Sequence, residues 1–150
     1  MAETYFFFNS IDDDRRVYSA EHFTILLSML FSNGVCGAPD SLQAFRDQLS
    51  ITVKAGGAII DGHFYNNSAP KSFTVTPPAS GVRYDRIVLR FDLSTNRIAL
   101  LLRKGSSSAA PEIIYNSQFR EIPICTLIAA SGTIVSVTDE RSFITLKGSG

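Results

Sequence analysis

The two histidines and two cysteines are the side chains best suited to metal binding or nucleophilic chemistry. A zinc site needs three or four ligands held close together. Neither His22 nor His63 has a second His, Cys or carboxylate at ligand spacing, and neither Cys36 nor Cys125 belongs to a CxxC motif. Cys125 lies in an apolar run, which favours a small buried side chain. The sequence therefore predicts no metal and no cofactor.

Patterns for acid–base, nucleophilic or phosphate chemistry are equally weak. The acids Asp12, Asp13 and Asp14 are adjacent, without the alternating spacing of a calcium loop. Gly56-Gly57 is not followed by the Gly-Lys-Ser/Thr of a phosphate loop. No Gly-x-Ser-x-Gly elbow occurs, although a triad built from distant residues is invisible in a sequence. We expect a protein that is not an enzyme.

Two segments pair an aromatic ring with amides, as sugar-binding loops often do. They are Tyr65-Asn66-Asn67 and Tyr115-Asn116. Such pairs are also common in ordinary turns. Glycan contact through Tyr65, Asn66, Asn67 and Tyr115 therefore stands beside a purely structural interpretation.

Charged residues at the ends of two strands predict a structural role. Asp85 and Arg86 open an otherwise apolar strand, and Asp139-Glu140-Arg141 follows the last one. We expect Arg86 or Arg141 to bond a carboxylate of the other cluster. Such a pair contributes about 1 kcal/mol at a part-exposed site.

A helix is predicted after residue 19. Ser19 is a suitable N-cap, and Asn33-Gly34 is a suitable stop. We expect the helix to cover an open face or end of a sheet. Its opposite side, which includes Ile25, is only weakly polar and is compatible with a subunit interface. The helical face has the i, i+3, i+4, i+7 spacing of Phe23, Leu26, Leu27, Leu30, Phe31 and Gly34.

The remaining pattern is that of β-strands. Residues 49–54 and 58–65 read as a hairpin around Ala55-Gly56-Gly57, with Gly62 as a bulge or close approach. Residues 83–93 and 97–104 read as two long strands joined at 94–96, and 122–129 as a central apolar strand. These elements predict a mainly β fold, a β-sandwich of short antiparallel strands with one N-terminal amphipathic α-helix.

The chain opens with four consecutive aromatic residues, Tyr5, Phe6, Phe7 and Phe8. An extended strand of this kind carries rings on both faces, so we expect it to be buried on both sides or docked into another subunit. The predicted organisation is a docking arm at 1–17, a helix-plus-sandwich domain at 18–147 and a flexible tail at 148–150.

The amino-acid composition limits the classes of partner that the chain is expected to bind. Lys and Arg number 14, as do Asp and Glu, so nothing indicates nucleic-acid binding. Charged residues are 19% of the chain, which implies either apolar surface covered by a partner or a well-filled β core. The apolar stretch 23–31 is too short to insert into a membrane, and the N-terminus does not read as a secretory signal.

An ordered series of short motifs resembles a known family. They are Arg16-Val17-Tyr18-Ser-Ala-Glu-His-Phe23, Phe31-x-x-Gly34-Val35, Ile51-Thr-Val-Lys-Ala-Gly56, Gly57-Ala-Ile-Ile-Asp-Gly62, Tyr65-x-Asn67, Tyr84-Asp-Arg-Ile-Val-Leu-Arg-Phe-Asp92, Arg97-Ile98, Lys104-Gly105, Pro111, Glu121-Ile-Pro-Ile124 and Thr138-Asp139-Glu140-Arg141. The series resembles the N-terminal assembly module of baseplate and receptor-binding appendage proteins from tailed bacteriophages and prophages of Gram-positive bacteria.

The resemblance implies a structural virion protein at the tail tip, assembled in the host bacterial cytoplasm. Its partners would be copies of itself in a trimer or six-fold set, tail hub or baseplate proteins, and a separate receptor-binding protein. The expected interface residues are Tyr5, Phe6, Phe7, Phe8, Tyr18, His22 and Ile25. Family members usually continue into stalks and carbohydrate-binding heads, whereas this chain stops soon after Arg141. It is therefore expected to be either an assembly module on its own or one whose receptor-binding part is another polypeptide. The alternative is a carbohydrate-binding module that recognises host cell-wall glycans, and a wall hydrolase ranks last.

Overall fold

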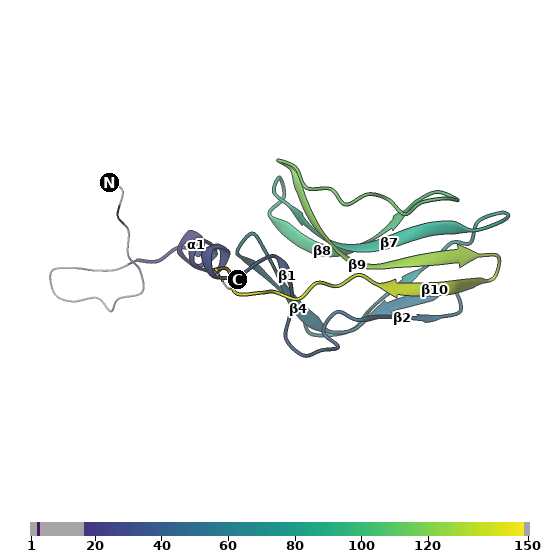
Figure 1. Ribbon diagram of the computed structural model, residues 1–150, viewed down its shortest axis with the longest axis horizontal. Coiled ribbons are helices and arrows are strands. Elements are labelled where there is room, and N and C mark those ends of the chain that lie inside the picture. Colours follow the sequence, from purple (N-terminus) through teal and green to yellow (C-terminus); the bar gives the residue numbers. More distant parts are fainter. Residues whose placement is uncertain (1–2, 4–16, 149–150) are drawn as a thin grey trace.

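Two packed β layers with an α-helix at one end make up the described part of the chain (Figure 1). The computed structural model describes residue 3 and residues 17–148. All strand pairs within its three sheets are antiparallel. The predicted mainly β fold with one N-terminal helix is confirmed for these residues.

One layer is a four-stranded sheet in the order β10-β9-β7-β8. It contains β7 (Arg83–Asp92), β8 (Arg97–Lys104), β9 (Phe119–Ala130) and β10 (Thr133–Asp139). β7 and β8 form the long hairpin predicted from the sequence, closed by the pair Asp92 and Arg97. The apolar run 122–129 lies in β9, an inner strand, as predicted.

The opposite layer consists of two three-stranded sheets. The first, in the order β1-β4-β5, contains β1 (Gly34–Cys36), β4 (Gly56–Ile60) and β5 (His63–Asn67). The second, in the order β2-β3-β6, contains β2 (Ala44–Asp47), β3 (Ser50–Val53) and β6 (Lys71–Thr74). The expected hairpin around Ala55-Gly56-Gly57 was wrong, because β3 pairs with β2 and β6 whereas β4 pairs with β1 and β5.

Gly56 and Gly62 have different structural roles from those expected in a single hairpin. Gly56 is needed for close packing, since a Cβ there would lie 2.1 Å from Ser41 Oγ. Of the two expectations for Gly62, the close backbone approach is confirmed, because a Cβ there would lie 2.1 Å from the carbonyl oxygen of Thr24, whereas no bulge forms. Gly62 sits with Asp61 in the two-residue turn between β4 and β5, and both have positive φ. Two positive φ values are the signature of the hairpin turn whose twist matches paired strands.

The hydrophobic core lies between the two layers. Burying one Leu or Ile side chain contributes roughly 1.5–3 kcal/mol, so this cluster dominates the stability. The alternation in the sequence predicts that Ile87, Leu89, Phe91 and Leu93 share one face of the strand at 83–93 and that Val88 lies on the other. The first three are buried, but Leu93 is 39% exposed and Val88 is fully buried. Helix residues are absent from the cluster, which comprises Val35, Leu42, Ile51, Val53, Ala58, Ile60, Val75, Ile87, Leu89, Phe91, Leu100, Ile124, Cys125, Leu127, Ala129 and Ile134.

Helix α1 (Ala20–Leu30) lies at one end of the sandwich, beyond the edge of the sheets (Figure 1). Ser19 is its N-cap, as predicted. Of the two expected positions, a face or an end of a sheet, the helix takes the end, next to the β4–β5 turn, and none of its residues is buried. It ends at Leu30 because Phe31 turns extended and forms a bridge with Leu146, while Gly34 belongs to β1.

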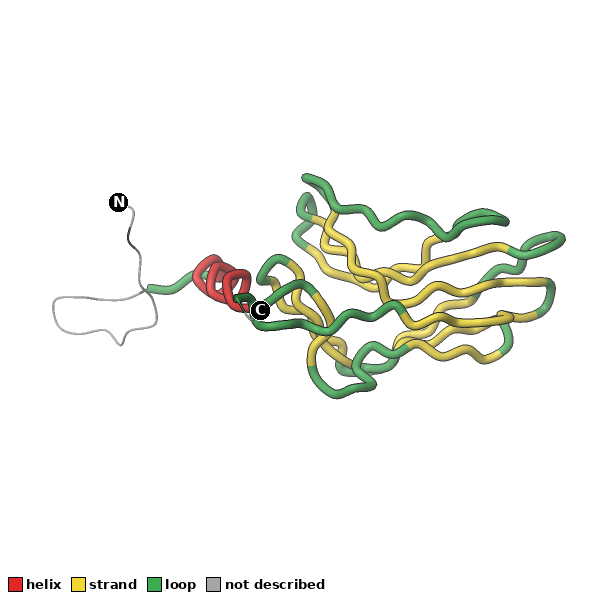
Figure 2. Tube along the Cα trace, in the orientation of Figure 1, coloured by secondary structure: helices red, strands yellow, loops and turns green. Residues whose placement is uncertain are grey.

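The segment after β10 runs back along β1 to the helix, as the loop trace in Figure 2 shows. Ile144 donates to the carbonyl of Val35 at 2.9 Å, and Lys147 donates to that of Leu30 at 2.7 Å. Residue 17 and residue 148 therefore lie at the same end of the molecule. Residues 1–2 and 4–16 of the predicted arm (1–17), and residues 149–150 of the predicted tail (148–150), lie outside the described residues, so the domain division stays a prediction. No helix in residues 17–148 is long and apolar enough to cross a membrane.

Candidate functional site

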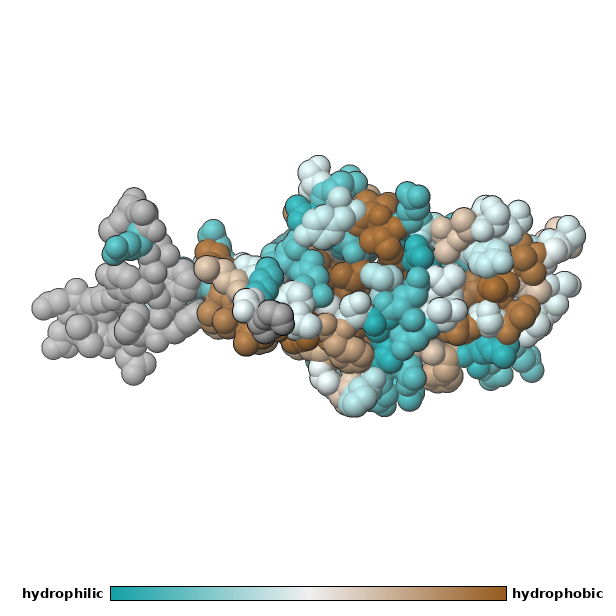
Figure 3. Space-filling view, in the orientation of Figure 1, coloured by the Kyte–Doolittle hydropathy of each residue, from teal (hydrophilic) through white to brown (hydrophobic). Residues whose placement is uncertain are grey.

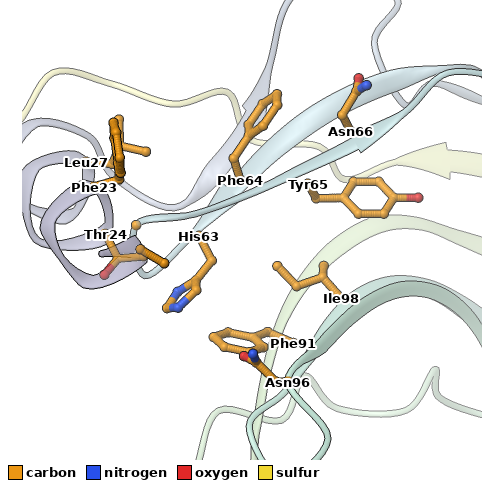
Figure 4. Close-up of a pocket in the computed structure, with 12 residues that line it drawn as sticks. Phe23, Thr24, Leu27, His63, Phe64, Tyr65, Asn66, Phe91, Asn96 and Ile98 are labelled. Carbon is orange, nitrogen blue, oxygen red and sulfur yellow. The ribbon is translucent and has the colours of Figure 1, made fainter. Parts of the chain in front are cut away.

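A hollow of about 590 Å³ opens between α1, strand β5 and the β7–β8 turn (Figure 4). The helix supplies its wall near the N-terminal end, β5 supplies one edge, and the four-stranded sheet supplies the floor. Aromatic and aliphatic side chains predominate, and two amides stand at the rim. The lining residues are Ala20, Phe23, Thr24, Leu27, Gly62, His63, Phe64, Tyr65, Asn66, Phe91, Asn96 and Ile98.

The floor of the hollow is built by ring contacts. The His63 and Phe91 rings lie 4.5 Å apart between centroids, and His63 Nδ1 lies 3.0 Å from the carbonyl oxygen of Asp61. Burial raises the pKa of Tyr65, so its hydroxyl stays protonated and can donate a hydrogen bond at neutral pH. The chemistry offered is stacking and neutral hydrogen bonding. Within residues 17–148, no group of three His, Cys, Asp or Glu is placed to hold a metal ion.

A polar network around Asp61 holds the β4–β5 turn beside the hollow. Its carboxylate accepts hydrogen bonds from Tyr115 Oη at 2.5 Å, Arg120 Nη1 at 2.6 Å and Asn33 Nδ2 at 3.1 Å. Burial raises the pKa of Asp61, but the hydrogen bonds from Tyr115 and Asn33 and the charge of Arg120 outweigh it, and the net pKa lies below the usual value. The network joins the helix end, the hairpin turn and the loop before β9.

The four residues expected to touch a glycan do not all converge. Tyr65 and Asn66 line the hollow, whereas Asn67 and Tyr115 do not. The Tyr115 ring lies 4.7 Å from the Arg120 guanidinium, and its hydroxyl is bonded to Asp61. Asn67 Oδ1 accepts a bond from the Ala69 amide, and its buried Nδ2 finds no acceptor among the described residues. Asn67 is the last residue of β5, beyond the part of the strand that lines the hollow.

A smaller hollow of about 260 Å³ lies on the outer face of the same sheet. It shares Phe64 and Asn66 with the first hollow and also includes Cys36 and Gly57. The Phe64 ring lies over Gly57, where a Cβ would come within 3.2 Å of Phe64 Cε1. Sequence analysis missed Phe64, which is 60% exposed. Its aromatic type at an outward position of β5 was the available signal.

The outer side of α1 is apolar. Met29 is 72% exposed, while Ile25 and Leu30 are each 39% exposed and Leu26 is 38% exposed. Ile25 and Met29 share one strip of the helix, and Leu26 and Leu30 share the adjacent strip, because residues four apart are neighbours. Figure 3 shows hydrophobic residues gathered over the helix on the visible face.

The other expected interface residues lie near the start of that helix or outside the described chain. His22 Nδ1 accepts a hydrogen bond from the Ser19 backbone at 2.8 Å, and the Tyr18 ring meets the His22 ring edge-on at 5.4 Å. Both side chains thus contribute to the helix start. The residues Tyr5, Phe6, Phe7 and Phe8 lie outside the described residues.

The pairing expected between the two charged clusters is made by Arg86 and Glu140. Arg86 Nε lies 3.0 Å from Glu140 Oε1, and Nη2 lies 3.1 Å from Oε2. Thr126 adds a bond to the same carboxylate at 2.7 Å. Asp85 instead pairs within its own strand, with Arg83 at 2.7 Å. The Arg86–Glu140 ion pair joins β7 to the end of β10 and so stabilises the sandwich.

Arg141 does not reach the other cluster. It forms a bidentate pair with Asp139 at 2.9 Å and donates to the carbonyl oxygens of Pro39 and Ser41. Its hydrogen bond to Asp139 lowers the pKa of that carboxyl. These contacts tie the segment after β10 to the loop that follows β1.

A third group of charged residues, centred on Glu121, was not identified from the sequence. Glu121 is 3% exposed and bonds Arg90 and Arg103, each at 2.7 Å. Its Oε1 also accepts the Ile114 amide at 2.9 Å. The three residues face one another across neighbouring strands, a proximity set by register rather than by local sequence.

Comparison with known proteins adds little. No family model matches the chain, and no curated protein matches it. One similar solved structure is the crystal structure of the gene 22 product of the Bacillus subtilis phage SPP1. The two share 17% identity over 71% of this chain and 81% of the other, with a TM-score of 0.48. A similarity this weak supports no inference about function.

Proposed function

We propose that this chain is a structural, non-catalytic virion protein of a phage tail, which builds a baseplate or appendage base by self-assembly and by docking to the tail tip. The virion context comes from the resemblance of the sequence motifs. The mechanism of assembly comes from the exposed apolar side of α1.

That helix is the observation that carries the proposal. It has 11 residues, none of them buried. Isolated helices shorter than about 12–15 residues are marginal in water and depend on packing of an apolar face. Here the sandwich provides little of that packing, whereas Met29 and its neighbours are exposed. A second molecule that covers this side would stabilise the helix.

The available energy suits an assembly of several copies. The exposed parts of Ile25, Leu26, Met29 and Leu30 amount to roughly two whole side chains, or ~3–6 kcal/mol for each copy on burial. Association itself costs about 4–15 kcal/mol. A single pair would therefore be weak. A two-fold contact buries this side on both copies and so doubles the gain, and further contacts within a closed set of copies add to it.

Sedimentation velocity tests the assembly part. Met29→Ala should remove about 1–2 kcal/mol per copy, or about 2–4 kcal/mol at a two-fold contact. The dissociation constant should rise by roughly 30- to 1,000-fold. Val135→Ala is the control, since Val135 is 48% exposed on β10, away from the helix. A wild-type protein that stays monomeric at all concentrations would count against self-assembly.

Immunogold electron microscopy tests the location. Tailed particles induced from the source strain would be labelled with antibody to this chain. Label confined to the tail tip is the expected result. Intact particles without label, with the protein free in the lysate, would contradict the virion role.

A second candidate function is recognition of host cell-wall glycans. The larger hollow favours it, because Tyr65 stands beside the amides Asn66 and Asn96 in a concave, aromatic-rich surface. Calorimetric titration with cell-wall polysaccharide fragments tests the idea. Binding should vanish in Tyr65→Ala and survive in Tyr115→Phe, whose ring lies outside the hollow. Absence of binding to the wild type would remove this candidate.

A further inference from the structure

Strand β5 is the edge of its sheet, in the order β1-β4-β5. No strand in residues 17–148 pairs with its other side. In a two-residue hairpin the flanking pair, here Ile60 and His63, is hydrogen-bonded, and the pairs then alternate. The backbone N–H and C=O groups of Phe64 and Asn66 consequently point away from β4, toward the open edge. That edge can accept another strand.

Hollows flank this edge on both faces of the sheet. The larger one, about 590 Å³, lies on the inner side with His63 and Tyr65. The smaller one, about 260 Å³, lies on the outer side with Cys36. Phe64 and Asn66 border both. The outer hollow extends from Phe64 and Asn66 over β4 and β1. A strand added to β5 would direct alternate side chains to the inner and the outer face of the sheet, beside these hollows.

We propose that the aromatic segment Tyr5–Phe8 of a second copy adds to β5 as an extra strand, which deepens and rests on the proposed self-assembly. Addition of a strand to a sheet edge is an established mode of peptide recognition. Four consecutive aromatics put rings on both faces of a strand, which is what an edge with hollows on both faces can accept. Few other extended segments would fill both sides.

The dimensions agree with this pairing. Four residues of extended strand span about 13 Å, and the five residues of β5 span about 17 Å. Residues 9–19, which separate the aromatic run from α1, reach at most about 36–40 Å. That reach allows the arm to cross to a neighbour whose helix packs against its own. The arm and the helix side would then act at the same contact.

Cysteine cross-linking between two differently sized copies tests the donor and the acceptor together. One copy carries Thr4→Cys, beside the aromatic run, and a longer tagged copy carries Asn66→Cys at the edge of β5. Both carry Cys36→Ser, because Cys36 lines the outer hollow. Buried Cys125 is left in place. A short bismaleimide is added to the mixture, and Ser131→Cys, exposed at the β9–β10 turn, replaces Asn66→Cys in the control.

The expected result is a mixed dimer at least tenfold more abundant with Asn66→Cys than with Ser131→Cys. Two results would overturn the proposal: equal yields in the two mixtures, or cross-linking confined to a single chain that carries both Thr4→Cys and Asn66→Cys. The second result would mean that each arm occupies its own β5. If self-association still depends on Met29 in sedimentation, only the arm proposal fails; if wild-type association is also absent, the proposed function fails with it.

Discussion

Substitution of Gly62 by alanine tests how α1 is seated on the sandwich. Gly62 has φ +79° in the β4–β5 turn, and a Cβ there would lie 2.1 Å from the carbonyl oxygen of Thr24. Gly132, in the β9–β10 turn, has φ +80° with nothing within 4 Å of its Cβ position. The two glycines therefore share one backbone conformation and differ in the contact with the helix.

The expected loss of unfolding free energy in each variant follows from that difference. The left-handed conformation costs an alanine about 1–2 kcal/mol at either position. Gly62→Ala must also move α1 by about 1 Å, because Cβ contacts under 3.0 Å are essentially never seen. Asn33, just after the helix, bonds Asp61 at 2.7 and 3.1 Å, and both bonds would lengthen beyond a useful distance. Their loss adds roughly 2–4 kcal/mol.

Urea denaturation of the two variants provides the measurement. Gly132→Ala should lose about 1–2 kcal/mol of unfolding free energy and Gly62→Ala about 3–6 kcal/mol. Hydrogen exchange in residues 20–30 should accelerate in Gly62→Ala alone. Equal losses in the two variants would refute the reasoning, since the close approach of helix and turn would then carry no energy in solution.

Three further predictions concern titrating groups. Asp61→Asn should cost roughly 1.5–3 kcal/mol at pH 7. Because the folded pKa of Asp61 is lowered, this contribution is present above the unfolded pKa of about 3.9 and is lost as pH falls through the folded pKa. Urea melts should therefore show the stability difference between wild type and variant shrinking as pH falls below about 3.9, and a constant difference would contradict the reasoning. Glu121→Gln should cost roughly 3–5 kcal/mol in urea denaturation, because Arg90 and Arg103 lose their shared carboxylate, and a loss below about 1 kcal/mol would show that both find other partners. Burial raises the pKa of Cys125 to about 12. Iodoacetamide at pH 8.5 should therefore leave Cys125 unmodified in the native protein and label it in the unfolded protein. Equal labelling of Cys125 in both states would contradict its burial.

Local sequence was sufficient for the long strands and for the helix start. The alternation of Ile87, Leu89 and Phe91 is a period-two signal for a strand, and all three are buried, although Val88 on the opposite face is buried as well. Ser19 marks the N-cap because its neighbours change to a helical period. These signals depend on residues a few positions apart, so they survive without knowledge of the fold.

The candidate site could be predicted only in part. Tyr65 and Asn66 were correctly paired, since adjacency in one strand brings them to one edge. Tyr115 was separated from them because Asp61 and Arg120 hold its hydroxyl and ring elsewhere. Phe64 was overlooked because its importance depends on β5 being an edge strand, a property of the assembled sheet.

By itself, then, the sequence determined the long strands β7, β8 and β9, the helix and the aromatic run at the N-terminus. Tertiary structure alone decided that Gly56 packs on Ser41 and that Thr24 of the helix lies against Gly62. It also decided that the helix stays outside the core and that hollows flank β5 on both faces. The physical reason is range: periodicity and capping act over one or two turns of chain, whereas sheet order and close backbone approach join residues that are distant in sequence.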